Sequence, residues 1–265
     1  MPHKVDAIVL CGGAGLRIRS VTGTAPKALA SIGDRPFLEI LLSQLQRQGF
    51  RDIILAVGYQ RDLIRAHFRD RVFGLNLRYS IESWPMGTGG ALRNAVDLVE
   101  SDAVLVMNGD SYTDADLVAF ARDYQEAKSD IAILVVPADG RVDCGLVSVD
   151  NRSKVFGFKE KQSEYGGQYV NAGIYMVTKH ILSDISSGAQ MSLETDLFPR
   201  WLAEGKYLRA FIHPGECIDI GTPERYQRAQ LTLANAEVGG THPGQSAKER
   251  ESSNLGDCRL HRWDE

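Results

Sequence analysis

The first half of the chain alternates short apolar runs with segments of helical periodicity, and this alternation restricts the fold more than any other feature. The runs have the length and composition of buried strands and lie at 7–10, 53–57, 77–81, 103–107 and 131–136. From Pro36 to Gly49, between the first two runs, apolar residues recur at three- and four-residue spacing. Strands that alternate with helices are typical of βαβ units and of a mostly parallel sheet. We therefore expect a doubly wound α/β layer over about residues 1–137.

The residues after Pro137 follow a different pattern. Strand-like segments and two helices are expected at 145–149, 155–158, 169–177, 192–204 and 223–235. From residue 237 onward, glycines, prolines and charged residues follow one another without periodicity, which is typical of disorder. We expect one domain over 1–236, made of a first half at about 1–137 and a second half at about 138–222, and a disordered tail at 237–265.

Charge and cysteine content exclude several classes of protein. The 30 Lys and Arg residues against 34 Asp and Glu residues give a net charge of -4, which argues against broad electrostatic capture of nucleic acid or of an anionic membrane. No apolar run approaches the length of a membrane span, and none near the N-terminus has that of a signal peptide. The four cysteines lack metal-ligand spacing and fit a reducing compartment. We expect a cytoplasmic protein with no nucleic-acid or membrane partner.

A glycine-rich loop at 10–17 follows the first predicted strand. Glycines let backbone N–H groups turn inward and let phosphate oxygens approach closely, although such a loop is as often a tight turn. Arg17 would offer phosphates a planar guanidinium with several fixed N–H donors, and Lys27 would offer an ammonium on a flexible side chain. Alternatively, both are solvated surface charges. Ile18 stands where a dinucleotide-binding fingerprint needs its third glycine, and no Gly-Lys-Ser/Thr triplet of a Walker A loop occurs.

Carboxylates in two other segments are candidate metal ligands. Asp110 ends the fourth predicted strand, at the edge of a parallel sheet where ligands bind, although it is equally a candidate turn or cap residue. Asp219 lies in the otherwise apolar stretch 217–223, where a carboxylate without a partner is costly. Asp114 and Asp116 form a competing Asp-x-Asp pattern. Because both begin a predicted helix, where acids favour the helix dipole, capping is the preferred interpretation of that pair.

Three further segments have both a structural and a functional interpretation. The stretch 82–91 follows the third strand and opens a helix whose N-terminal N–H groups suit an oxygen-rich ligand, or it is a capped turn with Thr88 as the cap. The Lys-Glu-Lys stretch at 159–161 is either a solvated strand end or part of a site. Asn-Ala-Gly at 171–173 is either a β-bulge or part of the same site.

Taken in order, these segments resemble the signature of the sugar-1-phosphate nucleotidyltransferases, also called nucleotide-sugar pyrophosphorylases. The resemblance rests on Gly-Gly-x-Gly-x-Arg from Gly12, Pro26-Lys27, the 82–91 stretch, Asn108-Gly109-Asp110 and the two segments at 159–161 and 171–173. The sequence departs from the family at Leu16, usually Thr or Ser, at Cys11, usually Ala, and at Ser20, usually Pro. The fold implied is a Rossmann-like, doubly wound, mostly parallel α/β sheet with a smaller sugar-binding lobe, of the nucleotide-diphospho-sugar transferase type.

The resemblance also implies a role for individual residues. Arg17, Lys27 and Lys161 would hold the reacting phosphates, and Asp110 and Asp219 would hold Mg²⁺. The base and ribose would be met by Leu10, Gly12, Gly13, Glu82, Gly87 and Thr88. The sugar would be met by Gly145, Glu160, Asn171 and Gly173. The first half of the domain would then bind the nucleotide and the second half the sugar phosphate.

The implied reaction joins a nucleoside triphosphate to a sugar 1-phosphate and releases pyrophosphate. The segments most resemble the D-glycero-α-D-manno-heptose 1-phosphate guanylyltransferases, which make GDP-heptose for bacterial surface polysaccharide. Glucose-1-phosphate thymidylyl- or uridylyltransferases and mannose-1-phosphate guanylyltransferases share most of these motif residues and remain alternatives. A catalytically silent nucleotide-sugar sensor is the non-enzyme alternative. It is disfavoured because all the residues expected to bind the reacting phosphates are present, and a sensor does not need all of them. A homo-oligomer is compatible with the sequence.

Overall fold

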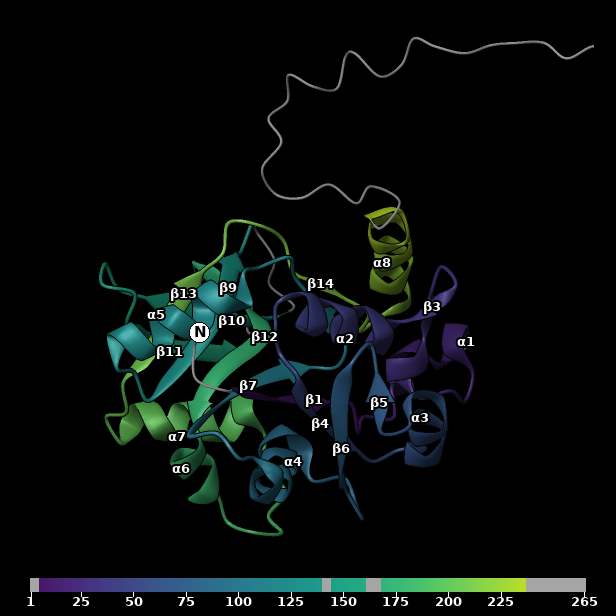
Figure 1. The fold of residues 1–265 in the computed structure, drawn as a ribbon. Coiled ribbons are helices and arrows are strands. Elements are labelled where there is room, and N and C mark those ends of the chain that lie inside the picture. The colour runs from purple at the N-terminus through teal and green to yellow at the C-terminus, as the bar shows by residue number, and fades with distance from the viewer. Residues whose placement is uncertain (1–4, 140–143, 161–167, 237–265) are drawn as a thin grey trace, which may run out of the picture.

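The computed structural model describes residues 5–139, 144–160 and 168–236, which form one large sheet with helices on both faces (Figure 1). The strand order is β11-β10-β12-β7-β1-β4-β6-β5, with β9 beside β12 and β13 beside β9. The tail expected at 237–265 lies outside the described residues, and so does Lys161.

The predicted parallel layer is confirmed in the first half of the chain. Its central strands are β1 (Asp6–Leu10), β4 (Asp52–Val57), β6 (Leu75–Ile81) and β7 (Ala103–Asn108). β1 pairs in parallel with both β4 and β7, and β4 pairs in parallel with β6. The short β5 (Arg71–Val72) is antiparallel to β6. Helices bury both faces of these strands, which explains the nearly continuous apolar runs in the sequence.

The second half extends the same sheet with antiparallel strands. They are β9 (Ile131–Pro137), β10 (Gly145–Val149), β11 (Val155–Glu160), β12 (Tyr169–Thr178) and β13 (Leu208–Ile212). β12 is antiparallel to β7 on one side and to β9 on the other, whereas β13 runs parallel to β9. Because β12 runs against β7, its first residues lie beside the carboxyl end of β7.

Two hydrophobic clusters, one on each face of the sheet, hold the helices in place. Along β1, Ala7 and Val9 belong to one cluster and Ile8 to the other, as alternation along a strand requires. The first face carries α2 (Phe37–Arg47), α3 (Arg61–Phe68), α5 (Leu117–Ala127) and α8 (Pro223–Ala236). The second face carries α4 (Gly87–Ala95), α6 (Lys179–Ser183) and α7 (Phe198–Ala203). Both halves of the doubly wound arrangement are therefore present.

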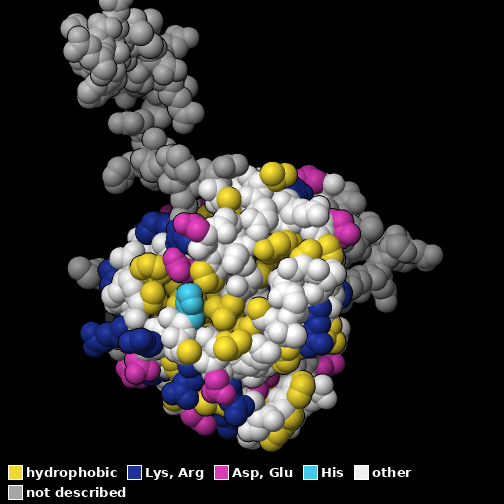
Figure 2. Space-filling view, turned by 90° about the vertical axis from the view of Figure 1, so that its right-hand side faces the viewer, with side chains coloured by type: hydrophobic (Ala, Val, Ile, Leu, Met, Phe, Trp, Pro, Cys, Tyr) yellow, Lys and Arg dark blue, Asp and Glu magenta, His cyan; other side chains and the backbone are white. Residues whose placement is uncertain are grey.

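Short elements connect these layers. They are η1 (Leu16–Ile18), α1 (Arg19–Thr22), η2 (Lys27–Leu29), β2 (Ser31–Ile32), β3 (Arg35–Pro36), η3 (Val96–Leu98), β8 (Ser111–Tyr112), the helical turn η4 (Leu193–Leu197) and β14 (Ile218–Asp219). Across the described residues, none of the helices has the length and apolar character needed to span a membrane. On the side that carries α1 and α3, basic, acidic and hydrophobic side chains lie interspersed (Figure 2).

Candidate active site

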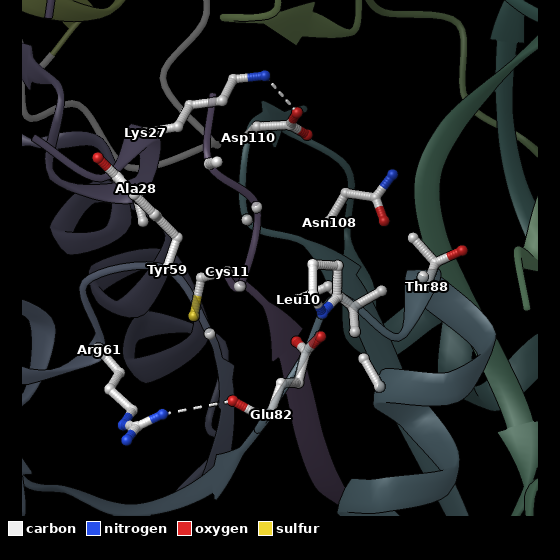
Figure 3. A pocket seen from close by; sticks show the side chains of 18 of the residues that line it. Leu10, Cys11, Lys27, Ala28, Tyr59, Arg61, Glu82, Thr88, Asn108 and Asp110 are labelled. Carbon is white, nitrogen blue, oxygen red and sulfur yellow. Dashed lines mark hydrogen bonds and ion pairs between the residues drawn. The ribbon is translucent and has the colours of Figure 1, made fainter. Parts of the chain in front are cut away.

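A cavity of about 730 Å³ opens at the carboxyl ends of the neighbouring strands β7, β1, β4 and β6 (Figure 3). Its walls come from three of the segments singled out in the sequence, and the lining includes residues 10–14, 82–85 and 108–110 together with Gly87 and Thr88. The edge of a parallel sheet at which its strands end is the usual place for a ligand in such folds. The predicted residues Leu10, Gly12, Gly13, Lys27, Glu82, Gly87, Thr88 and Asp110 all line this one cavity.

One end of the cavity carries an ion pair between Lys27 and Asp110. Lys27 begins η2, Asp110 follows β7, and the two side chains point toward each other, with Nζ 2.5 Å from Oδ2 (Figure 3). Burial opposes ionisation of Asp110, but the Lys27 ammonium and hydrogen bonds from Lys27 and Ser111 outweigh it and hold the pKa of the carboxyl below its usual value. Asp110 is therefore a carboxylate at neutral pH, as a metal ligand must be.

Asp219 lies beside this end of the cavity because its strand pairs with β8, directly after Asp110. Strand β14 pairs with β8 so that Asp219 lies opposite Ser111, and the N–H of Ile220 donates to the carbonyl of Asp110 at 3.0 Å. The Asp219 carboxylate accepts from Arg225 Nη1 at 3.0 and 3.1 Å and from the N–H of Gly221 at 2.9 Å. The partner that a carboxylate in this apolar stretch requires is thus Arg225.

Charged groups from three segments surround the space beside Gly221. A Cβ added to Gly221 would lie 2.8 Å from Asp219 Oδ1, 3.7 Å from Lys27 Nζ and 3.9 Å from Arg17 Nη2. Arg17 also contributes to the lowered pKa of Asp110. Four of the predicted charged residues therefore lie close together: Lys27 and Asp110, which line the cavity, and Arg17 and Asp219 beside them, outside its lining.

The donor set at this end fits a hard divalent cation. Within the described residues, no group of three or more His, Cys, Asp or Glu side chains could hold a metal ion. Asp110 lies in the turn between β7 and β8, and Asp219 lies on β14, which pairs with β8. Mg²⁺ commonly takes one or two protein carboxylates and completes its shell with water and substrate phosphates. The arrangement suits an ion that arrives with a phosphate substrate.

The other end of the cavity carries the carboxylate of Glu82. Its Oε2 accepts a hydrogen bond from the N–H of Met86 at 3.3 Å, and Arg61 Nη1 donates to its carbonyl oxygen at 3.4 Å (Figure 3). A Cβ at Gly12 would collide with Glu82 Oε1, so the glycine leaves room for the Glu82 carboxylate in its present position. Burial raises the pKa of the Glu82 carboxyl, and the Met86 hydrogen bond offsets only part of that rise.

The start of α4 differs from the expectation of free N–H groups at a helix N-terminus. The N–H groups of Gly89 and Gly90 donate to the carbonyl of Met191 at 2.8 and 3.3 Å, so these two donors serve the fold rather than a ligand. The helix N-cap is Met86, and Thr88, the expected cap, lies inside the first turn. The Thr88 hydroxyl donates to Glu194 Oε2 at 2.9 Å.

Glu194 is a residue that the sequence did not single out. It lies in the first turn after the Ser192 N-cap, where an acidic residue is common for its effect on the helix dipole. Nothing in the neighbouring sequence distinguishes Glu194 from an acidic residue that only stabilises the helix dipole. Its contact with a side chain in the cavity wall becomes visible only in the fold.

The residues predicted to meet the sugar lie on β12, which pairs with β7, and on β10 and β11 beyond it. Asn171 donates from Nδ2 to Tyr175 Oη at 2.8 Å and accepts from the N–H of Gly173 at 3.0 Å, in a β12 segment whose pairing with β9 is bulged. Gly173 has φ +73°, and a Cβ there would lie 2.7 Å from Nδ2 of Asn108 in the cavity wall. Gly145 pairs with Glu160 across β10 and β11.

The competing Asp-x-Asp pattern has a structural explanation. Asp116 is the N-cap of α5 and accepts from the N–H of Ala119 at 2.8 Å. Asp114 pairs with His213 Nε2 at 2.8 Å. Asp116 is thus a cap, as preferred, whereas Asp114 is a partner of His213.

A family model described as nucleotidyl transferase matches residues 6–236, so the chain belongs to the nucleotidyl transferase family. The predicted family, enzyme class and fold are thereby confirmed. The chain is 37% identical over 222 residues to the D-glycero-alpha-D-manno-heptose 1-phosphate guanylyltransferase of Campylobacter jejuni, covering 84% of this chain and 97% of that protein. It is 32% identical over 233 residues to the mannose-1-phosphate guanylyltransferase of Mycobacterium tuberculosis, covering 87% of this chain and 65% of that protein. A crystal structure of HddC from Yersinia pseudotuberculosis complexed with GMP-PN matches with a TM-score of 0.76 at 33% identity, covering 86% of this chain and 99% of that one.

Proposed function

We propose that the chain transfers the guanylyl group of GTP to D-glycero-α-D-manno-heptose 1-phosphate, giving GDP-heptose for surface polysaccharide and pyrophosphate. Two relatives that carry the heptose 1-phosphate guanylyltransferase name, at 37% and 34% identity, are matched over 97% and 98% of their lengths. The mannose-1-phosphate relative is matched over 65% of its length. The higher identity to the two heptose relatives than to the mannose relative, at 32%, supports the heptose substrate over the mannose substrate.

The position of Glu82 is the observation that supports guanine. Its carboxylate lies in the cavity wall at the end opposite Lys27 and Asp110, and one oxygen already accepts from Met86. A carboxylate has about four acceptor sites and donates nothing when ionised. The N1–H and N2–H₂ groups of guanine form a pair of donors that suits it. Uracil and thymine offer one N–H flanked by two carbonyl oxygens, which a carboxylate repels.

The phosphates of GTP are proposed to extend from Glu82 toward the charged end of the cavity. Arg17 would bind the departing pyrophosphate, Lys27 the α- or β-phosphate, and Lys161 the phosphate of the incoming sugar. Asp110 and Asp219 would hold Mg²⁺, which when bound would neutralise and orient phosphate oxygens. The backbone at Leu10, Gly12, Gly13 and Gly87 and the side chain of Thr88 would meet the base and ribose.

The residues of the chain act in this scheme by alignment and charge neutralisation. An oxygen of the sugar phosphate attacks the α-phosphorus, a new P–O bond forms, and the bond to the bridging oxygen of the β-phosphate breaks. That nucleophile is already ionised near pH 7, so no general base is needed. Two anions must meet, and cations fixed in advance lower the cost of that encounter. On the sugar, Gly145, Glu160, Asn171 and Gly173 would fix the ring.

The same proposal assigns the two halves of the domain over 1–236. Residues at about 1–137 bind the nucleotide, and residues at about 138–222 bind the sugar phosphate. The strands of both halves belong to the same sheet, and β12 lies directly beside β7. This continuity supports the proposal, because it brings the two sets of predicted residues to one edge.

Pyrophosphate release measured across nucleotide and sugar pairs tests the proposed function. GTP, dTTP, UTP, CTP and ATP are each combined with heptose, mannose and glucose 1-phosphates in the presence of Mg²⁺. We expect the highest kcat/KM with GTP and D-glycero-α-D-manno-heptose 1-phosphate. Preference for mannose 1-phosphate, or turnover with dTTP and glucose 1-phosphate only, would overturn the substrate assignment.

A further inference from the structure

A hydrogen-bond network centred on Glu194 connects the cavity to the segment proposed for the sugar. The carboxylate lies in η4, between the start of α4 and strand β12. Its Oε2 accepts from Thr88 Oγ1 at 2.9 Å and from Ser192 Oγ at 2.8 Å, and its Oε1 accepts from Tyr175 Oη at 3.4 Å. Thr88 lines the cavity, and Tyr175 contacts Asn171. One side chain therefore touches elements of both subsites.

The ionised carboxylate fixes the direction of each hydrogen bond in this network. A carboxylate only accepts, whereas a hydroxyl has one proton to donate and lone pairs to accept with. The hydroxyls of Thr88, Ser192 and Tyr175 therefore all direct their protons at Glu194. The oxygen of Thr88 is then left to accept from the N–H of Leu193, at 2.7 Å.

The same reasoning extends through Tyr175 to Asn171. Tyr175 is fully buried, and because its proton points at Glu194, its oxygen accepts from Asn171 Nδ2 at 2.8 Å. The amide oxygen of Asn171 accepts from the N–H of Gly173 at 3.0 Å. These two bonds determine which way the amide faces, and they leave one N–H and one lone pair of the Asn171 amide for another partner.

We propose that Glu194 is a positioning residue that orients Thr88 at the nucleotide subsite and, through Tyr175, Asn171 at the sugar subsite. This inference rests on the proposed function, which assigns Thr88 to the nucleotide and Asn171 to the sugar. Glu194 itself does not line the cavity and acts through its neighbours. The backbone around it is tied to the start of α4 as well, because Met191 donates to the carbonyl of Met86 at 2.9 Å.

Glu194→Gln tests the proposal with little change in side-chain volume. The amide NH₂ of Gln would face a hydroxyl proton, so at least one of the three hydroxyls must turn away. The hydroxyls that keep an acceptor would donate to a neutral amide oxygen in place of an ionised carboxylate, so both subsites lose a hydrogen bond to an ionised group. We therefore expect KM for GTP and KM for D-glycero-α-D-manno-heptose 1-phosphate each to rise about tenfold or more. Asp196→Asn is the matched control, since it neutralises an acid in the same turn whose carboxylate accepts from the N–H of Ser192. We expect it to change neither KM.

Tyr175→Phe separates positioning from general loosening of the fold. Removing that hydroxyl should raise KM for the sugar 1-phosphate and leave KM for GTP unchanged. In the double variant Glu194→Gln/Tyr175→Phe, the sugar KM should rise no further than in the single variants, while the GTP effect of Glu194→Gln persists. Thermal melting checks that every variant is folded, and dissociation constants for GTP and the sugar 1-phosphate from calorimetry give the same comparison without turnover.

Two results would overturn the positioning role of Glu194. One is a folded Glu194→Gln variant in which both constants equal those of the wild type. The other is a double variant whose effects on the sugar constant multiply, as independent sites do. If the wild type instead prefers a different nucleotide and sugar pair, the substrate assignment fails, and the same variants compared with that pair still test Glu194.

Discussion

Replacement of Glu82 by Gln should remove the preference for GTP. The N–H of Met86 requires an acceptor at the position of Oε2, so the Gln amide oxygen is expected to remain there. The amide NH₂ then takes the place of Oε1, beside Gly12, and faces the cavity. Guanine would meet a donor where it needs an acceptor.

The structure allows the size of this effect to be worked out. One hydrogen bond to an ionised group is lost, and one donor is left opposite another donor, which together cost about 3–4 kcal/mol. At about 1.4 kcal/mol per tenfold change, kcat/KM for GTP should fall by about 10²- to 10³-fold. UTP lacks the paired donors of guanine, so its kcat/KM should stay level or rise.

Pyrophosphate release with GTP and with UTP, at a fixed concentration of heptose 1-phosphate, measures the ratio of the two kcat/KM values. Glu126→Gln, at an exposed position on α5, is the control for loss of one negative charge. A folded Glu82→Gln variant with an unchanged ratio of GTP to UTP would refute the base-reading role of this carboxylate.

Three further predictions concern the same cavity. Gly12→Ala should push the Glu82 carboxylate aside and raise KM for GTP; a folded variant with an unchanged KM for GTP would contradict the contact. Because burial raises the pKa of Glu82, its acceptor form is lost at a higher pH than that of an ordinary glutamate. KM for GTP should therefore rise as the pH falls, starting above the pH at which an ordinary glutamate is protonated. Glu82→Gln should lack that part of the pH dependence, and an identical profile in the variant would contradict the assignment. Asp110→Asn and Lys161→Ala should each lower kcat/KM by at least about 10²-fold, the effect of losing one fixed electrostatic contact; a folded Asp110→Asn variant with full Mg²⁺-dependent turnover would show that Asp110 is not a metal ligand.

The sheet and much of the cavity could be predicted from the sequence because both follow from local sequence patterns. Strands buried on both faces read as continuous apolar runs, and residues that follow such strands collect at one edge. Asp110 follows β7, and Glu82 follows β6, so both lie in the cavity wall.

What the sequence could not predict depends on contacts between distant segments. Thr88 and Glu194 are 106 residues apart, and no local pattern signals their hydrogen bond. The start of α4 was expected to offer free N–H groups to a ligand. The acceptor that Gly89 and Gly90 use instead, the carbonyl of Met191, lies about 100 residues further along the chain, and no local pattern indicates it. Likewise, Asp116 and Glu194 are both acids at the start of a helix. Capping could be predicted for Asp116, whereas only the fold shows that Glu194 is the centre of a hydrogen-bond network.

The fate of labelled phosphates tests the central claim most directly. GTP labelled at the α-phosphate, and separately at the γ-phosphate, is incubated with the full chain, Mg²⁺ and D-glycero-α-D-manno-heptose 1-phosphate. We expect the α-label in the nucleotide sugar and the γ-label in pyrophosphate, in equal amounts. An α-label that remains in GDP, with the γ-label released as phosphate or transferred to the sugar, would contradict nucleotidyl transfer at this site.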